Sequence, residues 1–389
     1  MMTPLAESAL AILDRLIAFD TVSRNSNLPL VAYVSDYLTG HGIAHDVLPS
    51  PDGNKANILA TIGPADRPGI VLSGHTDVVP VDGQTWAHNP FRLTRVGDRL
   101  YGRGTSDMKG YVACVLALAP LLAGVDLRLP VHLALSYDEE VGCYGVHGIV
   151  EHMRHLGLRP GAALIGEPSR MGVVNGHKGS CGMLTRVNGA SCHSSRPELG
   201  VNAVFHAMDI MTDLRARGDA FAAAPDSVGV FDPPYTSISV GVIRGGTARN
   251  AIPGDCGFEW DIRATRPGVA EAVQQAVQQQ IDATVLPAMR ARNAGCTVVT
   301  EMVYDVPPLV PQPGCAAEAL AKTLSGANAT GTVPYGSEAG VFQLAGIPSV
   351  ICGPGDIAQA HTPDEWIEVA QIEACTEFLE RLLAHVSAA

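Results

Sequence analysis

The first third of the chain alternates between two hydrophobic periods, and this alternation constrains the fold more than any other feature. Apolar residues recur at intervals of three and four over residues 6–19 and 30–38, which is typical of amphipathic helices. Short apolar runs of strand length lie at 56–62, 69–72 and 131–135, each bounded by Gly, Pro or Asp. This alternation predicts an α/β domain with a mixed, mostly parallel sheet flanked by helices on both faces.

The order of elements changes between about residues 176 and 304. The pattern there predicts strand, helix, strand, strand, helix and strand, which is the ferredoxin-like βαββαβ arrangement. After this segment the α/β character returns and ends in an amphipathic helix over 369–386. We therefore predict one domain made of residues 1–175 and 305–389, with a second domain, residues 176–304, inserted into it.

Composition argues against several classes of protein. The 389 residues contain 26 Lys and Arg against 39 Asp and Glu, a net charge of −13, which argues against a nucleic acid or a membrane as partner. The longest uncharged stretch, 110–125, is shorter than the roughly 20 residues of a bilayer helix and contains Pro120, so we expect a buried helix. Glu7 and Asp14 lie near the start without a basic leader, which favours a cytoplasmic protein. Nine cysteines without a C-x-x-C spacing indicate neither a disulfide framework nor a thiolate zinc site.

Five polar clusters lie where the sheet of an α/β domain would collect them, just after predicted strands or near the C-terminus. They contain His75 and Asp77, Asp107, Glu139 and Glu140, Glu167, and His361. Taken singly, a histidine after a strand is more often a turn residue than a ligand, and adjacent acidic residues usually mark a solvated loop. Together they suggest a site, because ligands of α/β sheets bind at the carboxyl ends of the strands.

This set of residues suits divalent metal ions. Two imidazoles and several carboxylates, without thiolates, are typical of Zn²⁺ or a similar ion in a site open to water. Two ions need a shared ligand, and Asp107 could bridge them. His75 and Glu167 would complete the site of one ion, and Glu140 and His361 that of the other. We therefore predict two divalent ions, Zn²⁺ in the first place, with Co²⁺ as a substitute.

Two acidic residues remain for other tasks. Asp77 lies two positions from His75 and could accept the second ring N–H, which would fix the tautomer. Glu139, beside the ligand Glu140, could take a proton from water and pass it to a leaving nitrogen. Spacing alone leaves open which member of the Glu139–Glu140 pair is the base and which is the ligand.

The same stretches resemble a known family. The motifs concerned are His75-x-Asp77, residues 102–110, Glu139-Glu140, Gly166-Glu167-Pro168 and residues 360–365. In this order, and over nearly the whole chain, they are similar to the dinuclear zinc amidohydrolases related to acetylornithine deacetylase, which include succinyl-diaminopimelate desuccinylase, aminoacylases and glutamate carboxypeptidases. The resemblance implies the ligand assignment above, with Glu139 as general base and Glu140 as ligand. It also implies that the inserted domain is a lid and dimerisation domain on a catalytic domain.

The resemblance extends to residues of the inserted domain. His193 resembles a histidine that reaches across a homodimer into the neighbouring active site and polarises the scissile carbonyl, a contact worth roughly 3 kcal/mol. A polar turn histidine is the alternative. Asn250 and Arg263 resemble a clamp for the substrate carboxylate, which the planar fork of arginine binds with two hydrogen bonds. For Arg263 the alternative is an ion pair with Asp261.

We therefore predict a metal-dependent enzyme that hydrolyses the amide of an N-acyl amino acid, in the first place N²-acetyl-L-ornithine, in arginine biosynthesis. Glu338 is a candidate partner for the terminal ammonium of that substrate; a solvated residue at a helix N-terminus is the alternative. Another deacylase, desuccinylase or carboxypeptidase on this scaffold would keep every metal ligand. A non-catalytic metabolite-binding relative should lack a ligand or the base, and all seven metal-site positions are filled here.

Overall fold

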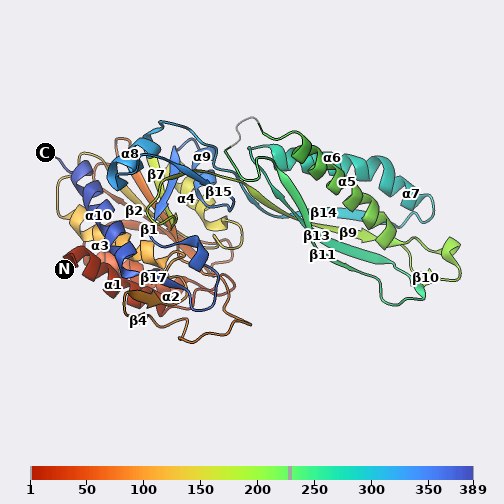
Figure 1. The fold of residues 1–389 in the computed structure, drawn as a ribbon, viewed down its shortest axis with the longest axis horizontal. Coiled ribbons are helices and arrows are strands. Elements are labelled where there is room, and N and C mark those ends of the chain that lie inside the picture. The colour runs from red at the N-terminus through yellow and green to blue at the C-terminus, as the bar shows by residue number, and fades with distance from the viewer. Residues whose placement is uncertain (1, 227–229, 389) are drawn as a thin grey trace. The chain divides into compact units, whose positions relative to one another are not determined.

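The chain forms two compact units in the computed structural model, which describes residues 2–226 and 230–388. The first, here called the α/β unit, comprises Met1–Gly176, Pro311–Thr332 and Ser337–Ala389. The second, here called the inserted unit, comprises His177–Val310 and Val333–Gly336. Figure 1 shows both units with many of their helices and strands labelled.

An eight-stranded sheet forms the centre of the α/β unit. Across the sheet, the strands are β1 (His45–Pro49), β2 (Ala56–Ile62), β6 (Val131–Ser136), β3 (Ile70–His75), β7 (Ala162–Pro168), β16 (Ser349–Gly353), β8 (Val174–His177) and β15 (Gly331–Val333). The neighbours β6, β3, β7 and β16 are parallel, whereas β1, β2 and β8 pair antiparallel. The four parallel strands are buried along their whole length, as expected where helices cover both faces. The predicted mixed, mostly parallel α/β fold is confirmed.

Helices flank this sheet. They are α1 (Pro4–Ile17), α2 (Leu28–Gly40), α3 (Lys109–Ala123), α4 (Tyr144–His155), α8 (Ala316–Ser325), α9 (Ala339–Leu344) and α10 (Val369–Val386). The apolar α3 is buried over nearly its whole length and contacts α1, α10 and β3, as predicted for the uncharged stretch. In the described part of the chain, the helices are all too short or too polar to cross a membrane.

A second, smaller sheet lies in the same unit. Its three antiparallel strands are β17 (Trp366–Glu368), β5 (Arg99–Tyr101) and β4 (Thr94–Val96). The pairing of β17 with β5 joins two distant parts of the sequence, of which one leads into α3 and the other into α10. The pairing therefore brings together the loop that follows β5 and the loop that precedes β17.

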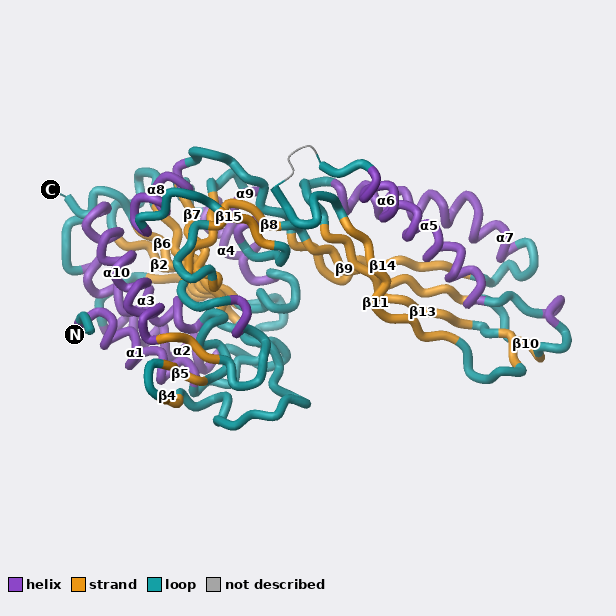
Figure 2. Tube along the Cα trace, viewed as in Figure 1, coloured by secondary structure: helices purple, strands orange, loops and turns teal. Residues whose placement is uncertain are grey.

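The inserted unit has the predicted ferredoxin-like order. Its four-stranded antiparallel sheet runs β11 (Ser237–Gly245), β13 (Asp255–Arg263), β9 (Ser180–Asn188) and β14 (Thr297–Val306). Helices α5 (Ala203–Ala223) and α6 (Val269–Gln280), followed by α7 (Leu286–Arg290), lie along one side of this sheet (Figure 2). Phe258, Trp260 and Met183 form part of the buried core of this unit. The short strands β10 (Cys192–His193) and β12 (Ala251–Ile252) pair with each other beyond the sheet.

Candidate metal centre

Four neighbouring strands of the α/β unit bring candidate ligands together. His75 is the last residue of β3, and Glu167 lies in β7, one residue before its end. Glu139 and Glu140 follow the end of β6, and His361 lies in the connection that leaves β16. Because β3, β6, β7 and β16 are parallel neighbours, their carboxyl ends lie at one edge of the sheet. The predicted gathering of these side chains therefore has a clear origin in the topology.

Asp107 reaches the site from a different element than predicted. We expected it just after a strand of the large sheet, but it lies two residues before α3, and the preceding strand, β5, belongs to the smaller sheet. Its two carboxylate oxygens face the two histidines. Oδ1 lies 3.0 Å from His75 Nε2, and Oδ2 lies 3.2 Å from His361 Nε2. A carboxylate placed between two imidazoles in this way can bridge two ions.

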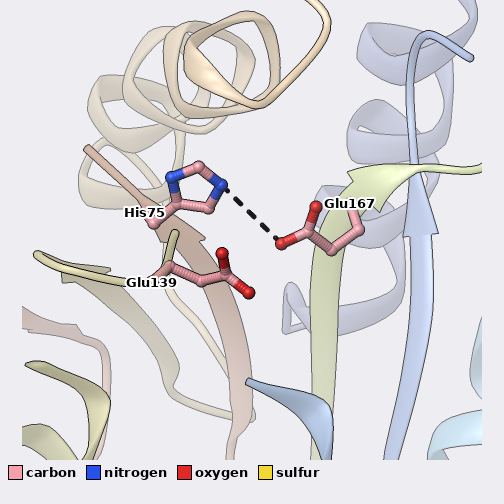
Figure 3. Close-up of side chains that lie close together, drawn as sticks. All are labelled: His75, Glu139 and Glu167. Atoms are coloured by element: carbon pink, nitrogen blue, oxygen red, sulfur yellow. Dashed lines mark ion pairs between the residues drawn. The ribbon is translucent and has the colours of Figure 1, made fainter. Parts of the chain in front are cut away.

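The remaining candidate ligands lie on either side of Asp107. His75 Nε2 lies 3.8 Å from Glu167 Oε1, with the carboxylate of Glu139 beside them (Figure 3). His361 Nε2 lies 3.0 Å from Glu140 Oε2. Ligand atoms about 2.0–2.2 Å from one Zn²⁺ ion lie roughly 3–4 Å from each other, which is the range of these separations.

Two groups of side chains meet the geometric requirement for an ion. His75, Glu139 and Glu167 form one group, and His75, Asp107 and Glu140 the other; within each, the ligand atoms lie within 4.8 Å of one another. Among the described residues, the buried oxygens Glu140 Oε1 and Glu167 Oε1 accept no hydrogen bond. A buried carboxylate oxygen without a donor is costly, and a cation would satisfy it. The donor set and these oxygens therefore fit a centre of divalent ions.

The charges of the centre also favour a site for divalent ions. Burial raises the pKa of Glu140 to about 7, and the charge of Asp107 adds to the rise. Burial also raises the pKa values of Glu139 and Glu167 well above their usual range, and neighbouring carboxylates reinforce the effect. Hydrogen bonds to Asp107 and Glu140 raise the pKa of His361 to about 10. The crowded carboxylates need compensating positive charge, which protons or metal ions can supply.

Asp77 forms hydrogen bonds with His75 and with the turn that carries Glu139 and Glu140. The acceptor closest to His75 Nδ1 is the backbone carbonyl of Asp77, at 2.9 Å, whereas the carboxylate oxygen Oδ1 lies at 3.5 Å. We expected the carboxylate itself to be this acceptor. Instead, the carboxylate accepts hydrogen bonds from Ser23 Oγ at 2.7 Å and from the backbone N–H groups of Glu139 and Glu140 at 3.1 and 3.3 Å. Asp77 thus holds both the histidine and the turn that carries the two glutamates.

Glu338 is buried, so the alternative of a solvated residue at a helix N-terminus is wrong. It directly precedes α9, is 1% exposed, and accepts a hydrogen bond from Ser73 Oγ at 2.9 Å and another from Ser136 Oγ. Ser73 and Ser136 belong to the buried strands β3 and β6, at the ends that lead to His75 and to the glutamate turn. Each oxygen of the Glu338 carboxylate therefore already has a donor within the protein. Its contact with a substrate ammonium stays a prediction.

Three serines that hold acidic side chains were missed by the sequence analysis. They are Ser23, which donates to Asp77, and Ser73 and Ser136, which donate to Glu338. A signal was available for Ser73 and Ser136, because each directly follows an apolar run of strand length, and a serine in a buried strand needs a hydrogen-bond partner. Nothing in the sequence pointed to the identity of that partner.

His193 and Asn250 lie together in the inserted unit. In the β10–β12 ladder, His193 pairs with Ala251, and the N–H of Ser194 donates to the carbonyl of Asn250 at 2.9 Å. The His193 side chain is exposed, and its Nδ1 lies 2.7 Å from Ser195 Oγ. The imidazole is therefore held locally on an exposed turn, and its catalytic role stays a prediction.

Arg263 lies at the other end of the inserted sheet. It is the last residue of β13, whose first residue, Asp255, adjoins the end that carries His193 and Asn250. Eight residues of extended chain separate the two ends by about 25 Å. Arg263 Nε donates to Asp261 at 2.7 Å, which is the ion pair named as its alternative. One inserted unit therefore does not bring Arg263 and Asn250 together.

Known proteins resemble this chain over almost its whole length. The sequence profile of peptidase family M20/M25/M40 matches residues 71–385. An acetylornithine deacetylase of Proteus mirabilis is 33% identical over 367 residues, covering 94% of this chain and 92% of that protein. One from Myxococcus xanthus is 33% identical over 393 residues, covering 96% of each. An M20 family metallo-carboxypeptidase from Sulfolobus solfataricus superposes with a TM-score of 0.75 at 18% identity, over 96% of this chain and 98% of that one, a likeness of fold.

Proposed function

The chain belongs to peptidase family M20/M25/M40 and is a metal-dependent hydrolase, and on this basis we propose that it hydrolyses N²-acetyl-L-ornithine to L-ornithine and acetate. The single observation that supports this reaction best is Asp107, whose two oxygens face His75 and His361. The choice of substrate rests on the acetylornithine deacetylases that match nearly the whole chain.

Two divalent ions would be held by five side chains at the edge of the sheet. His75 and Glu167 would hold one, Glu140 and His361 the other, and Asp107 both. When bound, such ions polarise the acyl carbonyl and lower the pKa of a water molecule. Two ions bring four positive charges to three carboxylates, which relieves the repulsion within the cluster. Zn²⁺ is the proposed ion because this mixture of imidazoles and carboxylates suits it.

Glu139 is the proposed proton carrier. Its carboxylate lies beside His75 and Glu167, close enough to accept a proton from the attacking water. The water oxygen bonds to the acyl carbon, the C–N bond then breaks, and Glu139 delivers the proton to the departing nitrogen. The products are a carboxylic acid and an amine, which exchange the second proton of the water to become a carboxylate and an ammonium ion, and Glu139 returns to its starting state.

A homodimer completes the proposed site. The substrate is much shorter than the β13 strand, so Arg263 and Asn250 of one chain cannot both contact its carboxylate. We assign Arg263 to the chain that holds the ions, and His193 and Asn250 of the partner subunit to the carbonyl oxygen and the carboxylate. Two features of the inserted unit support pairing: β11 is an edge strand, which can pair with another strand, and α5 exposes Phe205 and Met208.

Steady-state kinetics on a substrate panel test this proposal. The panel contains N-acetyl, N-succinyl and N-formyl derivatives of ornithine and of neutral and acidic amino acids, given to chelator-treated protein with and without Zn²⁺ or Co²⁺. We expect the highest metal-restored kcat/KM on N²-acetyl-L-ornithine. A higher value on another member would keep the mechanism and replace the substrate. Inactivity on every member would favour a metabolite-binding relative.

A further inference from the structure

Arg103 and Glu365, which have no task in the proposed reaction, form a fully buried ion pair that contacts the loops of Asp107 and His361. Arg103 and Glu365 are both 0% exposed, and Arg103 Nη1 lies 2.7 Å from Glu365 Oε2. Burying two charges costs more than their attraction returns unless their remaining hydrogen bonds are satisfied. An ion pair of this kind is poor evidence of a contribution to stability, so its other contacts indicate what it does.

Glu365 binds the loop that carries the shared ligand. Its Oε1 accepts hydrogen bonds from the backbone N–H groups of Ser106 at 2.9 Å and of Asp107 at 3.1 Å. Its Oε2 accepts one from the N–H of Gly104 at 3.0 Å, and its backbone carbonyl accepts one from the N–H of Gly102 at 2.9 Å. One residue therefore fixes four backbone amides of this loop, including that of Asp107 itself.

Arg103 connects the same loop to the loop of His361. Its Nη1 donates to the carbonyl of Thr362 at 3.3 Å, and its Nη2 donates to Gln84 Oε1 at 2.7 Å. Gln84 Nε2 in turn donates to the carbonyl of His361 at 2.9 Å. The guanidinium thus reaches Thr362, the residue after His361, directly, and His361 itself through Gln84.

We propose that Glu365 and Arg103 are positioning residues that hold Asp107 and His361 in the arrangement needed to bind two ions. The inference rests on the proposed metal centre. Asp107 faces His75 and His361 only while its backbone is fixed, and groups that orient metal ligands typically change metal affinity 10- to 100-fold when they are removed. A purely structural ion pair would instead affect folding and leave the affinity of the folded protein unchanged.

Glu365→Gln is the direct test. The amide has nearly the same shape, but it presents an NH₂ group where the carboxylate presents an acceptor. Either the N–H groups of Ser106 and Asp107, or the N–H of Gly104 and Arg103 Nη1, therefore lose their acceptor. Zn²⁺ binding to the chelator-treated protein is measured by isothermal titration calorimetry, and thermal unfolding is followed by circular dichroism. We expect the Zn²⁺ affinity of the folded variant to fall roughly 10- to 100-fold.

Glu318→Gln is the matched control. Glu318 is also buried, at 5% exposed, and its carboxylate accepts hydrogen bonds from Lys322 Nζ and Asn175 Nδ2, which belong to neither ligand loop. This variant removes a buried carboxylate of the same unit, so it reports the general cost of such a change. We expect its Zn²⁺ affinity to stay within about twofold of the unchanged protein, since it touches no group that orients a ligand.

Zn²⁺ affinity of folded Glu365→Gln equal to that of the Glu318→Gln control would overturn the inference. If Glu365→Gln does not fold, Gln84→Ala is the second test of the inference. Gln84 is half-buried and uncharged, so its replacement should leave the fold intact. Its expected effect is a several-fold loss of affinity at one of the two ions, and unchanged affinity at both would overturn the inference equally. Failure of the unchanged protein to bind Zn²⁺ would instead contradict the proposed function.

Discussion

Glu139→Gln and Glu140→Gln are adjacent and chemically identical substitutions, but the first should lower turnover and the second should lower metal affinity. Glu140 Oε2 lies 3.0 Å from His361 Nε2, and its buried Oε1 accepts no hydrogen bond among the described residues. Replacing this carboxylate by an amide removes a charge and turns one oxygen into a donor that repels a cation. Glu139 lies beside the ligands, and the proposed reaction uses it only to move a proton. Glu139→Gln should therefore leave both ions bound, whereas Glu140→Gln should weaken the binding of at least one.

The expected magnitudes follow from these positions. Loss of a general base lowers turnover about 10²- to 10⁴-fold, equivalent to about 3–5 kcal/mol on the barrier. For Glu139→Gln we expect a fall of this size in kcat, with Zn²⁺ affinity changed less than about threefold. For Glu140→Gln we expect at least one ion to be retained poorly, at a cost of about 10-fold or more in affinity.

The assay measures metal content and turnover on the same samples. Each variant is loaded with Zn²⁺, freed of unbound metal by gel filtration, analysed for metal per chain, and then assayed on N²-acetyl-L-ornithine at saturating Zn²⁺. Loss of an ion from Glu139→Gln would show that Glu139 is a ligand, and the assigned proton transfer would then be wrong. Substantial turnover by Glu139→Gln with both ions bound would refute it as well.

Three further predictions concern other parts of the chain. Burial lowers the pKa of His132 to about 4, so the unfolded chain takes up a proton before the folded chain as the pH falls below 6.5. The free energy of unfolding should drop by about 2 kcal/mol more between pH 7 and pH 5 than in His132→Asn, by urea titration; equal slopes would contradict the buried neutral imidazole. Arg263→Met should raise KM about 10- to 100-fold, the value of a charged hydrogen bond, and Arg263→Lys should raise it less; an unchanged KM would leave Arg263 with only its ion pair to Asp261. Mixing two inactive variants, His193→Ala and Glu139→Gln, should restore about a quarter of the normal activity through mixed dimers if His193 acts on the partner's site; no recovery after verified subunit exchange would contradict that arrangement.

The fold class could be predicted from the sequence because the spacing of apolar residues depends directly on which faces of each helix or strand are buried. The four central strands are buried on both faces and appear as short apolar runs, and the ferredoxin-like order is a regular alternation of the two periods. The outer elements were not predicted. β1 and β4 are mostly exposed and short, so they carry little apolar pattern, and the pairing of β5 with β17 joins segments that local sequence cannot relate.

The site was predicted where topology alone gathers residues, and less well elsewhere. His75, Glu140 and Glu167 follow from the carboxyl-end rule for parallel strands. Asp107 follows a strand as predicted, but that strand, β5, belongs to the smaller sheet, and the loop is fixed by Glu365, far along the chain. Glu338 directly precedes a helix, where an acidic residue usually meets water, but here it is buried and accepts hydrogen bonds from Ser73 of β3 and Ser136 of β6.

The separation of the inserted-unit residues also needed the structure. His193, Asn250 and Arg263 resemble parts of one substrate site, and the sequence gives no distance between them. Arg263 ends β13 at one end of the four-stranded sheet, whereas the β10–β12 ladder beside His193 and Asn250 lies beyond the other end. From that separation we infer that a single chain cannot supply the whole of the proposed site.

Stepwise metal reconstitution tests the central claim most directly. Chelator-treated protein receives Zn²⁺ in fractions of an equivalent, and bound metal per chain and the rate of acetate release from N²-acetyl-L-ornithine are measured at each step. We expect the rate to rise with bound metal and to reach its maximum as binding saturates at two ions per chain. Saturation at one ion with full activity, or full activity without metal, would contradict a centre in which Asp107 bridges two ions.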